Sequence, residues 1–221
     1  MTINVVQSVH GTGTSVSFTS NTTAGNTVFC GFVDVGGATA TSACKLGGVA
    51  GNFAKAIEKD GNSCVASLWY DAGCAGGQKA VAITATGSTT TPAIWAVEVS
   101  GLGTSGILDV SSSGTGTATS WSSGATATTA QPSEIAIGVV GNGSTSTTGP
   151  SSGWTNLRQS NTFAYFLGYE ILTATGTVTY SGSHGSEGWS VVVATFKAAP
   201  PVIPAPLMPV PAWPVQRSYL W

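Results

Sequence analysis

The chain is dominated by short runs in which apolar and polar residues alternate, rich in Val, Ile, Thr and aromatic residues and separated by Gly, Ser and Asn. A period of two is typical of β-strands, because successive side chains of a strand point to opposite faces of the sheet. No apolar residues recur with the period of a helix, and the many Gly and Thr residues disfavour helix. The pattern predicts an all-β fold, an antiparallel β-sandwich of jelly-roll-like type.

The runs also predict individual elements. Residues 79–85 and 93–100 are expected to pair with each other, and Asp60-Gly61 is expected to form a hairpin turn. Residues 111–129, almost wholly Ser, Thr, Gly and Ala, are expected to form exposed edge strands, and residues 142–153 a loop. The predicted strands are 3–9, 15–18, 26–33 (which has little polar face and is expected to be buried), 53–57, 63–70, 79–85, 93–100, 134–140, 154–160, 163–172, 175–180 and 189–196.

The end of the chain differs from the rest. Seven of the ten prolines lie within residues 199–221. Proline has no backbone N–H to donate to a sheet, so this segment is expected to be extended, in the polyproline II conformation, and not a central strand. The sequence therefore divides into a β-sandwich domain of residues 1–198 and an extended Pro-rich C-terminal arm of residues 199–221.

The arm is apolar, unlike a solvated linker, which would carry Ser, Glu or Lys. Two arrangements satisfy it: it folds back on its own sandwich, or it docks on a neighbouring subunit. Docking on a neighbour is favoured, because a stiffened apolar segment binds at low entropic cost. The predicted partner-binding residues are Pro200, Pro201, Val202, Ile203, Pro204, Leu207, Met208, Val210, Trp213, Tyr219, Leu220 and Trp221.

Charged residues make up only 7% of the chain, its net charge is −2, and no stretch clusters Lys or Arg. Nucleic-acid binding depends on neutralising phosphates with cations, so no nucleic-acid partner is expected. A weakly charged surface also repels itself weakly, which favours an assembled protein. No run is long enough to cross a membrane, and the N-terminus has no secretory signal. We therefore expect no membrane partner, and synthesis in a cytoplasm.

Few groups suited to catalysis occur. His10 and His184 are expected in exposed loops, and no serine stands in a nucleophile elbow. A glycosidase needs two acids facing each other across a cleft. Glu98 and Glu170 lie within apolar strands, where acids usually face solvent or form a hydrogen bond with a loop. The sequence predicts no catalytic residue and no cofactor.

No metal site is predicted either. Asp71 and Asp109 lack the Asp-rich loop of a calcium site, and the cysteine spacings match no zinc pattern. The cysteines are expected to act as small buried hydrophobic residues, with one or two disulfides as the alternative, whose pairing stays open. They are Cys30, Cys44, Cys64 and Cys74.

Tryptophans that precede the arm fall into two groups. Trp95 and Trp189 lie within predicted strands and are expected in the core. Trp121 and Trp154 flank polar loops, and surface tryptophans can stack on sugar rings. Trp121 and Trp154 are therefore the candidate platform for a glycan.

Four stretches resemble a β-sandwich module of phage minor tail and other virion surface proteins, found also in some bacterial surface proteins. They are residues 26–29 (NTVF), residues 67–84 (SLWY, then GGQKAVAIT), residues 96–102 (AVEVSGL) and residues 188–197 (GWSVVVATFK). The matching residues belong to strands, turns and core, so the resemblance implies the fold more firmly than an activity.

The resemblance implies a non-enzymatic virion structural protein, either a minor tail protein or a head decoration protein, assembled in the host cytoplasm. The implied partners are other virion proteins and further copies of this chain. Repeated copies would multiply weak contacts into stable attachment. The alternative is a carbohydrate-binding module that recognises a host surface glycan.

Overall fold

The computed structural model describes residues 2–37, 39–48, 53–143, 147–159 and 165–201. These residues form sixteen strands, every pairing between them is antiparallel, and no helix lies among them. The predicted all-β antiparallel character is thus confirmed, and the described residues include no helix able to span a membrane. The strands are β1 (Asn4–Thr12), β2 (Ser15–Ser17), β3 (Thr27–Val35), β4 (Ala40–Leu46), β5 (Ala54–Gly61), β6 (Cys64–Asp71), β7 (Ala80–Thr86), β8 (Ala93–Ser100), β9 (Leu108–Gly116), β10 (Ser120–Ser122), β11 (Glu134–Asn142), β12 (Thr147–Thr148), β13 (Thr155–Gln159), β14 (Phe166–Leu172), β15 (Ser181–His184) and β16 (Trp189–Lys197).

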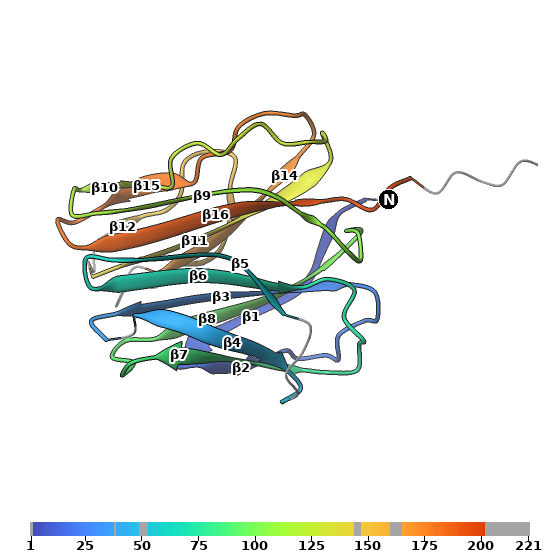
Figure 1. Cartoon of the computed structure of the whole chain (residues 1–221), viewed down its shortest axis with the longest axis horizontal. Coiled ribbons are helices and arrows are strands. Elements are labelled where there is room, and N and C mark those ends of the chain that lie inside the picture. Colours follow the sequence, from blue (N-terminus) through green and yellow to red (C-terminus); the bar gives the residue numbers. More distant parts are fainter. Residues whose placement is uncertain (1, 38, 49–52, 144–146, 160–164, 202–221) are drawn as a thin grey trace, which may run out of the picture.

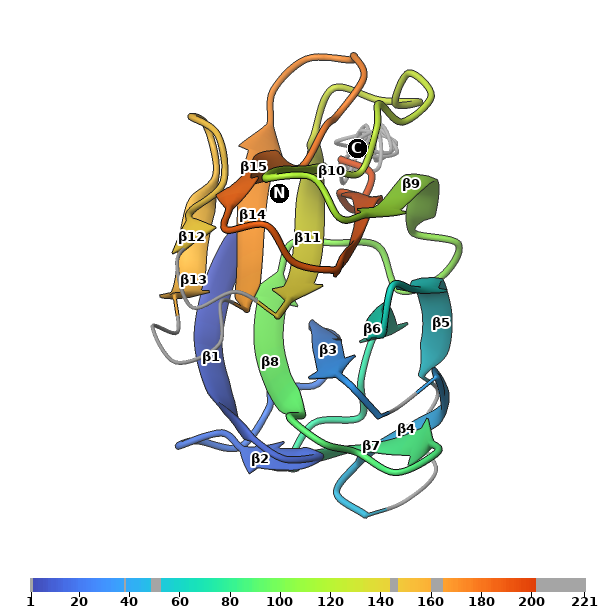
Figure 2. The same ribbon diagram turned by 90° about the vertical axis from the view of Figure 1, so that its left-hand side faces the viewer.

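The strands form four sheets that lie on one another as layers (Figure 1). Two five-stranded sheets occupy the centre of the stack, with strand orders β1-β8-β3-β6-β5 and β13-β14-β11-β16-β9. A three-stranded sheet, β2-β7-β4, covers the first, and another, β10-β15-β12, covers the second. Figure 2 shows the same stack from one end. The molecule therefore has two layers more than the single sandwich that the sequence predicted.

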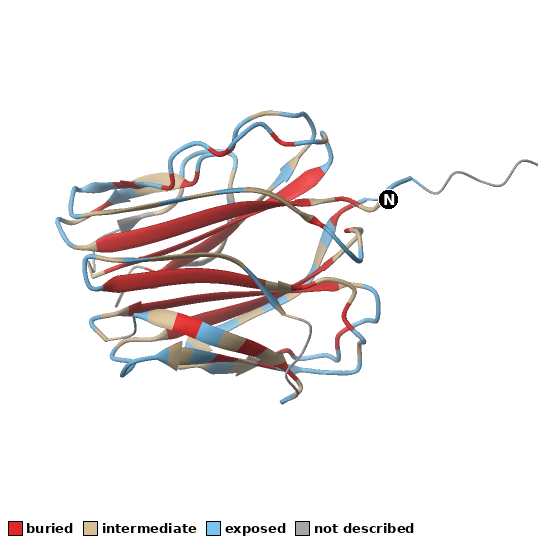
Figure 3. Cartoon of the chain, in the orientation of Figure 1, coloured by how far each residue is buried: buried red, intermediate tan, exposed pale blue. Residues whose placement is uncertain are grey.

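The inner strands of both central sheets, such as β3, β11 and β16, are buried on both faces, as the red strands of Figure 3 show. Strand β3 illustrates how the sequence achieves this. Phe29 and Val33 face the other central sheet, whereas Val28, Cys30 and Phe32 face the outer sheet β2-β7-β4. The predicted burial of this strand is confirmed, and the near absence of polar residues follows from it.

The strand order of the first half of the chain repeats in the second half, with every strand number raised by eight. The sheet β1-β8-β3-β6-β5 corresponds to β9-β16-β11-β14-β13, and the sheet β2-β7-β4 corresponds to β10-β15-β12. The two halves lie with their larger sheets face to face and share one apolar core between them. The chain is thus built from two similar units of eight strands.

The registers of the two halves also match. Val99 in β8 and Phe196 in β16 are counterparts, because each pairs with the first strand of its half beside an irregularity in the register. From these counterparts, the paired residues can be followed from β8 through β3 to β6, and from β16 through β11 to β14. This aligns residues 68–71 (Leu-Trp-Tyr-Asp) with residues 167–170 (Leu-Gly-Tyr-Glu). The repeat is therefore present in the sequence, but it covers too few identical residues to be recognised there.

The segments that leave β8 and β16 meet each other. Leu102 forms an antiparallel bridge with Ala198, and the Ala199 N–H donates to the Gly101 carbonyl oxygen at 2.9 Å. The approximate two-fold relation between the halves maps the contact of Leu102 with Ala198 onto the contact of Ala199 with Gly101. The second half therefore ends at the point where the connector between the halves begins.

Several local predictions are wrong. Asp60 and Gly61 pair within β5, and the hairpin turn is formed by Asn62 and Ser63, whose φ values of 51° and 61° are those of a type I′ turn. Strands β7 and β8 do not pair with each other, because β7 belongs to an outer sheet and β8 to a central one. Strand β4 (Ala40–Leu46) was not predicted, since its sequence ATSACKL contains one large apolar residue.

The low-complexity segment has a more specific structure than edge strands alone. Strands β9 and β10 do lie at sheet edges, as predicted, but residues 123–129 then run beside residues 176–180. Every third residue of the first segment, namely Ser123, Thr126 and Thr129, forms two hydrogen bonds with the second segment. The Thr126 N–H donates to the Val178 oxygen at 2.9 Å, and the Val178 N–H donates to Thr126 Oγ1 at 3.0 Å. Three residues of one segment thus span two of the other, as in a repeated β-bulge, and the strand predicted at residues 175–180 is absent.

The shared core predicts the effect of one substitution. Phe29 is fully buried between the central sheets, with its ring centroid 4.6 Å from that of Phe196. Replacing it with Ala leaves a cavity, so Phe29→Ala is expected to lower the free energy of unfolding by ~3–5 kcal/mol in urea titrations. The control is Val6→Ala, since Val6 is 49% exposed. Equal effects of the two substitutions would contradict this role of Phe29.

Candidate docking site

The arm leaves the body at the end of the stack where the chain also begins (Figure 1). The Ala198 N–H donates to the Ser133 carbonyl oxygen at 3.0 Å, and the Ala199 N–H donates to the Gly101 carbonyl oxygen. Of the predicted partner-binding residues, the structure describes Pro200 and Pro201. Val202, Ile203, Pro204, Leu207, Met208, Val210, Trp213, Tyr219, Leu220 and Trp221 lie outside the described residues.

Two hollows flank the first residues of the arm and share Pro132 and Ser133 as a ridge. One, of about 260 Å³, is lined by residues 131–133 and 198–201. The other, of about 580 Å³, is lined by residues 2–4, by the ridge, and by residues 171–173. We call the larger one the terminal groove. Sequence reasoning missed it, because its walls come from three distant segments.

The terminal groove has an apolar floor and an apolar rim. Ile3 is buried beneath it, and Ile171 at its edge is 44% exposed. Within the described part of the chain, Val6 and Ile171 are the two large hydrophobic side chains classed as exposed. The arrangement can therefore accept an apolar segment, and none of its lining residues carries a charge.

A small cluster of charged groups lies behind the ridge. Lys197 Nζ is 3.8 Å from Asp109 Oδ1, and the Ala130 N–H donates to Asp109 Oδ2 at 2.6 Å. The neighbouring Glu134 is fully buried at the start of β11. Burial raises the pKa of Glu134, the Thr195 hydroxyl lowers it by a smaller amount, and the negative charge of Asp109 raises it further. Glu134 therefore keeps its proton to a higher pH than an exposed glutamate does.

Glu98 has a structural role. Its carboxylate is fully buried in β8 and accepts hydrogen bonds from Gln7 Nε2 (2.6 Å), the Thr23 N–H (2.8 Å) and Asn26 Nδ2 (2.6 Å). The expectation that this acid bonds a loop is confirmed, and the alternative, a solvent-facing position, is wrong. Glu170 is partly buried, and that burial raises its pKa.

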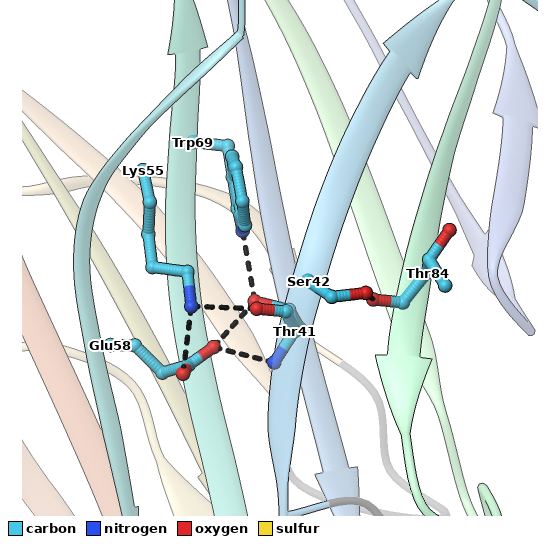
Figure 4. A network of polar contacts seen from close by, with 6 residues as sticks. All are labelled: Thr41, Ser42, Lys55, Glu58, Trp69 and Thr84. Atoms are coloured by element: carbon cyan, nitrogen blue, oxygen red, sulfur yellow. Dashed lines mark hydrogen bonds and ion pairs between the residues drawn. The ribbon is translucent and has the colours of Figure 1, made fainter. Parts of the chain in front are cut away.

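Glu58 belongs to a second structural network, shown in Figure 4. Lys55 Nζ lies 2.9 Å from Glu58 Oε1 and donates to the Thr41 carbonyl oxygen at 2.6 Å, while it sits 5.1 Å from the centroid of the Trp69 ring. Thr41 donates its N–H and its hydroxyl to Glu58 and accepts from Trp69 Nε1. The network ties β4 of the outer sheet to β5 and β6 of the central sheet.

The predicted glycan platform is not supported. Trp121 is 1% exposed and packs against Tyr180, so the expectation that it is an exposed platform is wrong. Trp154 is half-buried, with its ring centroid 4.5 Å from that of Tyr180. Both rings contribute to the core under the sheet β10-β15-β12, whereas Trp95 and Trp189 are buried as predicted.

The histidines are far from forming a catalytic pair with each other. His10 is exposed within β1, in the first half. His184 is buried in β15, so its predicted exposed position is wrong. Burial lowers the pKa of His184, and nearby backbone groups of Gly185 and Ala118 offset that effect only in part.

The cysteines are buried thiols, in line with their predicted role as small hydrophobic residues. Burial raises the pKa of Cys64 to about 12, which opposes formation of the reactive thiolate. Cys30 and Cys44 belong to the core between β3 and β4, and burial raises the pKa of Cys30 as well. Within residues that the structure describes, no three His, Cys, Asp or Glu side chains gather to hold a metal ion.

The position of Glu134 predicts a pH effect on stability. A raised pKa means that the folded protein keeps a proton that the unfolded chain releases above the ordinary pKa of 4.5. Stability is therefore lost as the pH rises from there through the folded-state pKa. Because Gln cannot ionise, the stability of Glu134→Gln relative to the original protein should increase between pH 4 and pH 7 in urea titrations.

The matched control is Asp60→Asn, which removes an exposed carboxyl from β5. Its effect on the free energy of unfolding should stay within about 0.5 kcal/mol at both pH values. A stability difference for Glu134→Gln that does not change with pH would show that the buried carboxyl titrates normally.

Comparisons of this chain with family models, with curated proteins and with solved structures give no match. The geometry described above is therefore what any functional assignment has to explain.

Proposed function

We propose that this chain is a non-enzymatic structural protein of a phage virion, a minor tail protein or a head decoration protein, that attaches to neighbouring virion subunits through its arm. The observation that carries the proposal is the contrast between body and arm. Every described sheet already covers its apolar face with another sheet. An apolar, proline-rich segment then follows at one end, next to a groove.

The strand order supports a virion body. Each half orders its strands as 1-8-3-6-5 and 2-7-4, and we propose that each is a jelly-roll-like unit, an architecture common in capsid proteins. Two such units packed face to face share one apolar core. Fold alone does not imply function, so the contrast between body and arm remains the main support for the proposal.

The polar chemistry of the body supports the same proposal. Glu98, Glu58 and Asp34 accept hydrogen bonds from loops or neighbouring strands. These acids therefore hold the fold together. The chain would assemble with other virion proteins and with copies of itself after synthesis in the host cytoplasm.

The role is tested by locating the chain. Particles are purified from lysates of the producing host, labelled with antibody against this protein, and imaged. Label at a fixed position on head or tail supports the proposal. Full recovery of the protein in the particle-free fraction contradicts it.

Removal of the arm gives the corresponding prediction. The cut is placed after Pro201, because Ala198 and Ala199 form hydrogen bonds with the body. The shortened chain should keep the β-type circular dichroism of the full chain and lose at least about nine-tenths of its particle association, since repeated weak contacts fail together. A control replaces Arg217 with Gln and leaves the apolar residues in place. Normal incorporation of the shortened chain would exclude attachment through the arm.

A further inference from the structure

We propose that the terminal groove of one molecule binds the proline-rich arm of a second copy of this chain. The groove is formed by residues 2–4, 132–133 and 171–173, and the occupant is the segment 202–221 of the neighbouring copy. This inference rests on the proposed function, in which the arm is an attachment device, and it names the surface to which the arm attaches.

The internal repeat shows which surface lies uncovered. Asp71 and Glu170 are counterparts, so residues 72–74 of the first half correspond to residues 171–173 of the groove. In the first half the connector between the halves covers this surface. Thr104 lies so close to Gly73 that a Cβ on that glycine would be 2.9 Å from Thr104 Cβ. Among the residues that the structure describes, the corresponding surface of the second half is open, and it forms the groove.

The sequence of the arm disfavours the path of that connector. The connector turns at Gly101 and Gly106, which have φ values of +85° and +58°. Counting on from the counterparts Val99 and Phe196, the arm has Ala198 and Ile203 at these two positions. Positive φ is a strained conformation for a residue with a side chain, and most of all for a β-branched one. The sequence of the arm therefore disfavours the route that would cover its own groove.

The arm also lacks the residues that supply turns with positive φ. No Gly, Asn or Asp occurs after Gly188, and these are the residues that adopt positive φ most readily. Pro200 and Pro201 at its root, with Pro204 and Pro206 beyond, restrict the backbone to extended conformations, including that of each residue before a proline. An extended segment that leaves one body reaches the groove of another more readily than its own.

Length and chemistry fit this occupant. In polyproline II conformation residues 202–221 span about 60 Å, enough to cross to a neighbouring body. The segment offers Val, Ile, Leu, Met and Trp between its prolines, and the groove offers Ile3, Pro132, Ile171 and Leu172. Because the arm and the groove are different surfaces, the contact is heterologous, and such contacts build rings or filaments of repeated copies.

The test uses the full-length chain and two matched substitutions. Ile171→Asp places a charge at the rim of the groove, where the side chain is exposed and the aspartate can contact water in the unassembled protein. The control is Val6→Asp at the other exposed large hydrophobic residue. Leu108 pairs with Phe196 as Val5 pairs with Val99, so Asp109 is the counterpart of Val6 in the other half. At Val6 itself, the exposure of the side chain lets an introduced aspartate stay in contact with water.

Sedimentation velocity over a range of protein concentrations measures self-association. The original protein and Val6→Asp should associate with dissociation constants within about twofold of each other, and Ile171→Asp should weaken association at least about tenfold, since it buries an unpaired charge. A synthetic peptide of residues 202–221 should dissociate the assemblies of the original protein. A peptide of the same composition in scrambled order should not.

Three results would overturn the inference. The first is an original protein that stays monomeric at every concentration. The second is equal weakening by Ile171→Asp and Val6→Asp, and the third is assembly that the peptide leaves intact. A monomer that does not bind the added peptide would show that its own arm occupies the groove. Antibody labelling of particles reports on the virion role separately, so unlabelled particles with intact self-association would contradict that role and leave the groove assignment standing.

Discussion

The structure depends on the burial of two five-stranded sheets on both of their faces. Each central strand must supply apolar side chains to two cores at once, which leaves it almost no polar positions. The outer three-stranded sheets exist to keep water off the far faces, and they can do so with small residues because their own outer faces meet solvent. This one requirement explains the layered shape, the apolar central strands and the polar, weakly charged exterior.

The same requirement governs the ionisable groups. A carboxylate placed in a strand buried on both faces must find donors, and Glu98 finds them in the loop after β2. Glu134 lies at a comparable depth, beside Asp109, and burial favours its neutral form. Glu98 thereby stabilises the junction between this loop and the sheet.

The sequence predicted the fold class and most of the strands, because hydrophobic alternation depends on near neighbours alone. Residues 93–100 became β8 with unchanged bounds. Prediction from the sequence failed where contacts between distant segments determine the structure. Trp121 stands between serines and is buried only because β15 and Tyr180 lie over it, and the groove beside Ile171 takes its walls from three segments. The two-fold repeat was not recognised in the sequence, because the two halves share their strand registers but few identical residues.

The ladder between residues 123–129 and 176–180 has a consequence for how this protein can change over time. Only one position in three uses a hydroxyl side chain in the ladder. Ser123 and Thr126 both accept and donate through their hydroxyl groups, and Thr129 accepts from the Gly176 N–H. Of the intervening positions, Gly124 has a φ of 70°, which favours glycine. Ala125, Ala127 and Thr128 are exposed and carry no such demand. The low-complexity segment of residues 123–129 can thus accept substitutions at the outer surface of the molecule without loosening the strands beneath.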